Sequence, residues 1–132
     1  MPQLTPDAIT LLRGTNLAYV ATINEDGSPH VAPMWVDVDS DRDLILLNTA
    51  DGRQKVRNVR RDPRVGLSSH DRDEPWPPLV VRGVIERITT EGADDHIDFL
   101  CRKYNGEPWT PREGQVRLIL EVRPHSVAFP RI

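Results

Sequence analysis

The sequence is poor in the residues on which several common kinds of chemistry depend. A single cysteine, Cys101, cannot form an internal disulfide. The four histidines do not have the spacing of metal ligands. No Gly-x-Ser-x-Gly, Gly-x-Gly-x-x-Gly or Walker loop occurs, and no apolar run approaches the roughly 20 residues that cross a bilayer. These absences argue against a zinc site, a nucleophile-elbow hydrolase, a Rossmann unit, a P-loop NTPase and a membrane span.

Size and composition predict one domain over residues 1–132. A hydrophobic fraction of 38% beside 28% charged residues indicates a globular chain with a lean core, which favours further burial in an oligomer. The first ten residues lack the basic and apolar regions of a signal peptide, so the cytoplasm is the expected compartment. A net charge of −3 argues against general nucleic-acid binding.

The positive charge is concentrated in one segment. Between Arg53 and Arg64 there are six cations and one anion, a net +5, which leaves −8 for the rest of the chain. The chain has fifteen arginines and two lysines, and one of the lysines, Lys55, stands among the arginines of this segment. A lysine is a compact point charge on a flexible stem, so its presence among arginines suggests that a compact charge is needed at position 55. A basic segment on an acidic body predicts a specific anionic ligand.

Apolar and alternating runs separated by turn residues predict a mainly β chain. Strands are expected at residues 17–23, 30–38, 44–48, 64–69, 79–88, 116–122 and 126–129, and helices at residues 6–13, 51–61 and 90–104. Mostly short connections favour an antiparallel barrel over a βαβ sheet. Pro33 cannot donate to a strand ladder, so it is expected at an edge or a bulge. Gly83 indicates a bulge or a close backbone approach, and Pro124 is expected to break the last strand.

The most informative stretch is residues 46–67. A buried strand ends in Asn48-Thr49, and after a short turn a helix opens with Arg53, Gln54 and Lys55. The free N–H groups and the dipole of a helix start attract anions, and the added side-chain cations and donors would complete a phosphate pocket. The alternative is a solvated amphipathic helix whose arginines pair with the acidic body. The residues alone leave both interpretations open.

Several motifs together resemble one family. These are a hairpin before the site, a strand ending in Asn-Thr, the block Lys-Val-Arg-Asn-Val-Arg-Arg-Asp-Pro at residues 55–63, and a following Arg-Val-Gly-Leu strand. This arrangement is similar to the pyridoxamine 5′-phosphate oxidase-like (PPOX class) flavin-binding split barrels. More narrowly, it resembles the actinobacterial branch of oxidoreductases that depend on the deazaflavin coenzyme F420. The resemblance covers nearly the whole chain, and the block at residues 55–63 is its specific part.

The resemblance implies a mainly β, antiparallel FMN-binding type of split barrel that forms a homodimer with two cofactor sites at its interface. Lys55 would hold the cofactor phosphate, and the ring system would lie along residues 30–36. Deeper in the helix, some of the polar side chains would face an acidic tail such as the oligoglutamate of F420. The cofactor-binding residues implied in this way are Lys55, Arg53, Gln54, Thr49, Asn48, Pro33, Met34, Trp35, Arg60 and Asn58.

The implied activity is that of an F420H2-dependent oxidoreductase, which transfers a hydride between the deazaflavin and a small unsaturated organic substrate. A cofactor that carries the hydride removes the need for a protein nucleophile. Two alternatives stay open: an FMN-dependent oxidase or reductase of the same barrel type, and a non-enzymatic cofactor-binding protein. No catalytic residue, metal, nucleic acid or membrane is implied, and substrate contacts are expected from the loops at residues 69–78 and 105–114.

Three further side chains have two interpretations each. Tyr104 is expected to be a core tyrosine at a helix end, with a proton donor as the alternative. His96 is expected on a solvated helix face among three aspartates, with a metal ligand as the alternative. Trp109 is expected to pack locally, with a role at the partner's site as the alternative.

Overall fold

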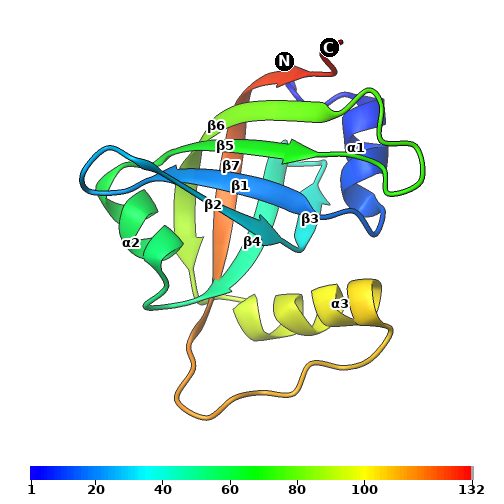
Figure 1. Ribbon diagram of the computed structural model, residues 1–132. Helices are drawn as coiled ribbons and strands as arrows, with labels where there is room; N and C mark the ends of the chain where they lie inside the picture. Colours follow the sequence, from blue (N-terminus) through cyan, green and yellow to red (C-terminus); the bar gives the residue numbers. More distant parts are fainter. Residues whose placement is uncertain (132) are drawn as a thin grey trace.

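One antiparallel sheet forms the body of the molecule in the computed structural model, which describes residues 1–131. The sheet has seven strands in the order β2-β1-β5-β6-β7-β4-β3 and curls into a half-open barrel (Figure 1). The elements are α1 (Pro6–Arg13), β1 (Ala18–Ile23), β2 (Pro29–Met34), β3 (Val36–Asp39), β4 (Leu44–Ala50), α2 (Gln54–Arg61), β5 (Arg64–Ser69), β6 (Leu79–Thr89), α3 (Ala93–Asn105) and β7 (Arg117–Ala128). The predicted mainly β, antiparallel split barrel is confirmed.

The strand expected at residues 30–38 is in fact two strands that meet at Trp35. β2 pairs with β1, whereas β3 pairs with β4 on the other side of the barrel opening. The chain therefore turns a corner of the barrel at Trp35, which one continuous strand could not do. β2 is an edge strand of the sheet, as its Pro33 predicts.

The predicted irregularity at Gly83 is confirmed, and the predicted break at Pro124 is wrong. Gly83 pairs with Pro124, and the register between β6 and β7 shifts just before this pair. A side chain on Gly83 would collide with the carbonyl group of Arg123, so the two backbones approach closely here. The bulge places Pro124 where its missing N–H interrupts no regular ladder, and β7 continues through it.

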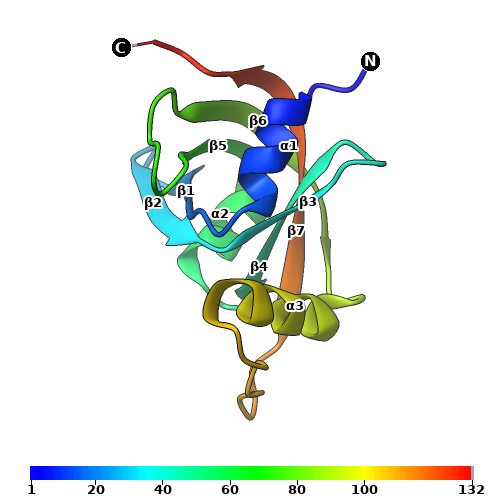
Figure 2. The ribbon, with the colours of Figure 1, turned by 90° about the vertical axis from the view of Figure 1, so that its right-hand side faces the viewer.

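The helices cover the barrel in three different places (Figure 2). α1 packs near β3, and its Leu12 is fully buried among the barrel side chains. The Thr5 hydroxyl caps this helix by accepting from the Ala8 N–H at 3.2 Å. α3 lies outside the barrel against β7 and β4, and a long loop leads from its C-terminal end back to β7 (Figures 1 and 2).

α2 follows β4 and begins at Gln54, three residues later than predicted. Asp51 and Gly52 form a turn instead, in which Gly52 has a φ of +91° that other residues rarely adopt. This turn folds the chain sharply back, so that the first residues of α2 lie close to the end of β4. The same sharp turn brings the predicted anion-binding residues together.

Candidate functional site

A cavity of about 320 Å³ lies where β4 ends and α2 begins. It is lined by seven of the ten residues that the family resemblance implies for cofactor binding. β2 and the corner residue contribute Pro33, Met34 and Trp35; β4 contributes Asn48 and Thr49; the start of α2 contributes Arg53 and Lys55. Five further residues complete the lining: Leu17, Ala50, Ile97, Trp109 and Arg117.

Three cations converge on this cavity. Burial lowers the pKa of Lys55 below its ordinary value, and the neighbouring charges of Arg53 and Arg117 lower it further. Within residues 1–131, the side chains of Lys55 and Arg53 form no hydrogen bond or ion pair. Neighbouring like charges repel each other unless an anion lies between them, and the repulsion is stronger for Lys55 and Arg117, which are half-buried. The site is therefore electrostatically prepared for an anion.

Backbone geometry at the start of α2 adds to this attraction. Arg53 occupies the N-cap position in extended conformation, and its side chain forms no capping hydrogen bond. The first N–H groups of a helix have no acceptor within the helix, and the helix dipole makes its N-terminus electropositive. The nearby Thr49 hydroxyl, also in the cavity lining, can donate to the same ligand.

Arg117 is the most important residue that sequence reasoning missed. It opens β7 opposite Ala50 in β4, and only this strand pairing brings it to the cavity. Its Nε donates to Asn48 Oδ1 at 2.9 Å, and its terminal nitrogen donates to Gln115 at 3.1 Å. Its guanidinium lies 5.1 Å from the ring centre of Trp109, a cation–π distance. These contacts hold the guanidinium in one orientation.

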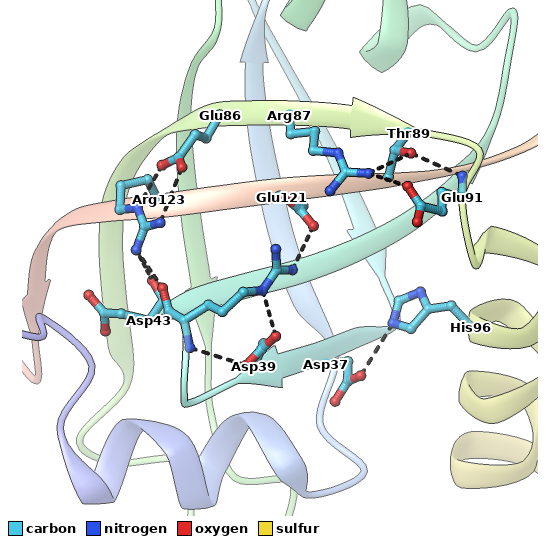
Figure 3. Close-up of polar contacts among 11 residues, drawn as sticks. Asp37, Asp39, Asp43, Glu86, Arg87, Thr89, Glu91, His96, Glu121 and Arg123 are labelled. Carbon is cyan, nitrogen blue, oxygen red and sulfur yellow. Dashed lines mark hydrogen bonds and ion pairs between the residues drawn. The ribbon is translucent and has the colours of Figure 1, made fainter.

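His96 is not on a solvated helix face, so that interpretation is wrong. Its side chain is only 9% exposed and pairs through Nε2 with Asp37 at 3.3 Å (Figure 3). Its Nδ1 lies 3.1 Å from Asn48 Nδ2. This contact was not predicted, because the three aspartates near His96 in the helix suggested that its side chain is exposed to solvent. Residues 1–131 contain no cluster of side chains arranged to hold a metal ion.

Three of the predicted cofactor residues do not line the cavity. Gln54 donates to Asn58 at 2.8 Å and accepts from Arg57 at 2.7 Å, so its amide nitrogen and oxygen both have partners on the helix. Arg60 forms an exposed ion pair with Asp51 at 2.9 Å. The proposed contact of the helix arginines with an acidic tail thus competes with existing partners, because Arg61 also donates to the carbonyl of Ile23.

Asn58 is the third of these residues and is completely buried. Its Nδ2 donates to the hydroxyl of Thr22 at 3.0 Å and to Asn24 Oδ1 at 2.9 Å. It therefore fastens α2 to β1 and the following turn. A neutral amide among five basic residues of the helix region is the signal that could have revealed this, since uncharged polar side chains are buried more readily than arginine.

A second hollow of about 390 Å³ adjoins the first and shares Leu17 and Trp35 with it. Its walls are rich in rings: Trp35 stacks on Tyr104 with centroids 5.5 Å apart, and Tyr19 stacks on His70 at 6.3 Å. The Tyr104 hydroxyl donates to the Asn16 carbonyl at 2.6 Å. It also accepts from the Val36 N–H at 3.2 Å. These bonds hold the hydroxyl in place, but the residue is only half-buried and lines the hollow, so the expected core position is not what the structure shows.

The fold and the site define a class: a split barrel with a cationic cavity between a strand end and a helix start. The chain belongs to the pyridoxamine 5′-phosphate oxidase family, which it matches over residues 4–129. Within residues 1–131, no helix is both long and apolar enough to cross a membrane.

Individual relatives carry more specific names. The chain is 27% identical over 121 residues to an F420H(2)-dependent biliverdin reductase of Mycobacterium tuberculosis, covering 92% of this chain and 84% of that protein. It is 32% identical over 96 residues to a 5a,11a-dehydrotetracycline/5a,11a-dehydrooxytetracycline reductase of Streptomyces rimosus, covering 68% of each chain. A solved F420 reductase superposes with a TM-score of 0.82 at 31% identity, over 92% of this chain and 95% of the other.

Proposed function

We propose that this protein is an F420H2-dependent reductase that transfers a hydride between coenzyme F420 and a small unsaturated organic substrate. The observation that carries the proposal is the convergence of three cations on one cavity with no carboxylate in its lining. The relatives named as F420H(2)-dependent biliverdin reductase and F420 reductase support the choice of deazaflavin.

The residues present fit such a cofactor. Lys55, Arg53 and Arg117 would hold its phosphate, with the N–H groups at the start of α2 as additional donors. The apolar side of the cavity, formed by Pro33, Met34 and Trp35, would lie along the ring system. When bound, the deazaflavin supplies the hydride, and the protein positions the ring and excludes water. Gln54, Asn58 and Arg60 are not included in this proposed site because they do not reach the cavity.

The adjoining ring-lined hollow is the proposed place of the substrate. It shares Trp35 with the cofactor cavity, so a molecule in it would lie beside the ring system. His70 and Asn105 in its lining come from the two segments expected to contact substrate, residues 69–78 and 105–114. Because the Tyr104 hydroxyl is engaged by backbone groups, we expect solvent or another side chain to supply the proton that accompanies reduction.

We also propose that two copies pair through the outer face of the sheet, and that the protein acts as a cytoplasmic, single-domain homodimer. Tyr19, Val31 and Val80 lie on this face and are 40%, 61% and 39% exposed. The strand registers place all three on one face, since Tyr19 is paired with Ser68 and Ser68 with Val80, while Val31 is paired with Ala21, two residues from Tyr19. An apolar sheet face of this kind is a liability in a monomer. Light scattering of the wild type and of Val31→Glu tests the pairing: the wild type should have twice the monomer mass and the variant a lower mass.

The cofactor assignment is tested by titrating the purified protein with F420 and with FMN while following ligand fluorescence. Lys55→Met should reduce F420 binding at least tenfold, because it removes one charge-assisted contact to the phosphate. Arg60→Met is the matched control: it removes a cation from the same helix but outside the cavity, so it should bind F420 as the wild type does. Tight FMN binding without F420 binding would favour the FMN-dependent alternative and contradict the proposal.

Turnover distinguishes an enzyme from a carrier. The wild type, loaded with F420H2, should oxidise the cofactor in the presence of conjugated acceptors, which is followed by the return of F420 absorbance. Binding of F420 without any turnover across a broad panel of acceptors would favour the non-enzymatic alternative.

A further inference from the structure

A continuous chain of polar contacts leads from Asp37 in β3 to the cationic cavity. The Asp37 carboxylate pairs with His96 Nε2 at 3.3 Å, and His96 Nδ1 lies 3.1 Å from Asn48 Nδ2 (Figure 3 shows the first contact). Asn48 Oδ1 in turn accepts from Arg117 Nε at 2.9 Å. Four residues from β3, α3, β4 and β7 are thereby linked, and only the last two line the cavity.

The donor and the acceptor of each hydrogen bond in this series of contacts can be assigned from the chemical groups involved. A guanidinium can only donate, so the Asn48 oxygen must face Arg117. The Asn48 amide nitrogen then faces the Ala93 carbonyl, at 2.9 Å, and His96 Nδ1. Since an amide nitrogen only donates, His96 Nδ1 must offer a lone pair. The imidazole is thus neutral, with its proton on Nε2 and directed at Asp37.

The residues that make these contacts are largely buried, and the Asp37 carboxylate among them is charged. The Asn48 and His96 side chains are nearly buried, and that of Asp37 is 19% exposed. Burial raises the pKa of Asp37, but the hydrogen bonds from His96 and the Val38 N–H, with the charge of Lys103, bring it below its ordinary value. The carboxylate therefore stays charged. Of the charged groups, Asp37 contacts the imidazole directly, the charge of Lys103 acts on Asp37, and the charge of Asp94 acts on Arg117.

We propose that His96 is a positioning residue that holds Arg117 in its anion-binding orientation by fixing the Asn48 amide. This proposal rests on the proposed function, because it assigns Arg117 to the cofactor anion. The neutral imidazole keeps the Asn48 oxygen turned toward Arg117. A protonated imidazole has two donors and no acceptor, so it cannot receive the Asn48 N–H. The amide must then turn or move away, and Arg117 loses its partner.

A functional consequence follows from this geometry. Loss of the acceptor that His96 presents to the Asn48 amide releases Arg117 from this orientation and weakens binding of the cofactor. Arg117 keeps its contacts with Gln115 and Trp109, which is why the change reduces affinity without removing the residue from the site.

Two substitutions separate the two ends of the imidazole. His96→Asn places an amide oxygen near the Nδ1 position and can still accept from Asn48, but its short side chain does not reach Asp37. His96→Gln places its amide near the Nε2 position, where it can still contact Asp37, but it offers no acceptor to Asn48. The probe is F420, with the dissociation constant of each protein measured by fluorescence at pH 8.

His96→Asn should bind F420 within about twofold of the wild type, because it keeps the acceptor for the Asn48 amide. His96→Gln should bind about tenfold more weakly, the effect of one hydrogen bond to a charged group.

The outcomes are distinguishable. Absence of F420 binding by the wild type refutes the proposed function itself. Normal wild-type affinity that both variants retain overturns the role of His96. Equal loss in His96→Asn and His96→Gln also overturns it, since a merely structural histidine would be disturbed by either change. Urea unfolding of each variant establishes that folded protein is compared.

Discussion

Substitution of the buried Asn58 tests whether this residue stabilises the fold or binds the cofactor. Its position in the basic segment suggests a ligand contact, whereas the structure shows three internal hydrogen bonds: to Thr22, to Asn24 and from Gln54. Asn58→Ala removes all three and leaves the Thr22 hydroxyl, itself 2% exposed, without its donor. The substitution should therefore affect the stability of the fold and leave the cavity composition unchanged.

The expected size follows from those contacts. Each hydrogen bond contributes about 1 kcal/mol net, so the free energy of unfolding should fall by about 3 kcal/mol. The small cavity left by the missing amide adds to this loss. With a urea m-value of about 2 kcal/mol/M, the unfolding midpoint should fall by about 1.5 M. Asn58→Asp should also destabilise, because a carboxylate cannot donate to Thr22 and Asn24.

The assay combines urea unfolding followed by tryptophan fluorescence with an F420 titration of the folded protein. Asn58→Ala should show the lower midpoint and a dissociation constant within about twofold of the wild type. Arg60→Ala is a suitable comparison, since its exposed ion pair with Asp51 should contribute less than about 1 kcal/mol. An unchanged midpoint with a strongly reduced F420 affinity would refute the structural role of Asn58 and restore it to the binding site.

Three other substitutions have defined outcomes. Lys55→Met should raise the unfolding midpoint in anion-free, low-salt buffer, because burial and the charges of Arg53 and Arg117 oppose the ammonium and lower its pKa; an unchanged midpoint would argue against repulsion in the cavity. Burial lowers the pKa of Lys103 to about 8 from its usual 10.5, and the unfolded chain then holds more protons between these values. The free energy of unfolding should rise from pH 8 to pH 10.5 in the wild type relative to Lys103→Met, and parallel pH curves would contradict this. Arg42→Met should destabilise by about 2 kcal/mol, because the nearly buried Glu121 carboxylate loses its partner at 2.7 Å (Figure 3), and Glu121→Gln in the same chain should recover part of the loss.

Most of the fold was accessible from sequence because its signals are local. Alternating apolar runs and the turn residues between them act within a few residues, and the cap that Thr5 provides to Ala8 at the start of α1 is equally local. The division of the long strand at Trp35 was not accessible. It depends on β2 and β3 pairing with different strands, and this choice is made by contacts distant in sequence.

The site was accessible only in part, for the same reason. Lys55 and Thr49 lie in one short stretch, so their spacing along the chain places them together. Arg117 comes from a strand more than sixty residues further on, and only its pairing with Ala50 brings it there. His96 appeared exposed because its own helix face is acidic, yet its partners are on β3 and β4.

The cavity also shows why binding residues can weaken the fold that contains them. A carboxylate beside Lys55 or Arg53 would relieve their repulsion and stabilise the ligand-free protein, but it would then compete with the ligand anion. Arg117 avoids this competition by using the uncharged Asn48, Gln115 and Trp109 as partners. Neutral acceptors orient the guanidinium without neutralising it, so its full charge remains for the ligand. The stability lost to unpaired charge should accordingly reappear as stabilisation when an anion binds.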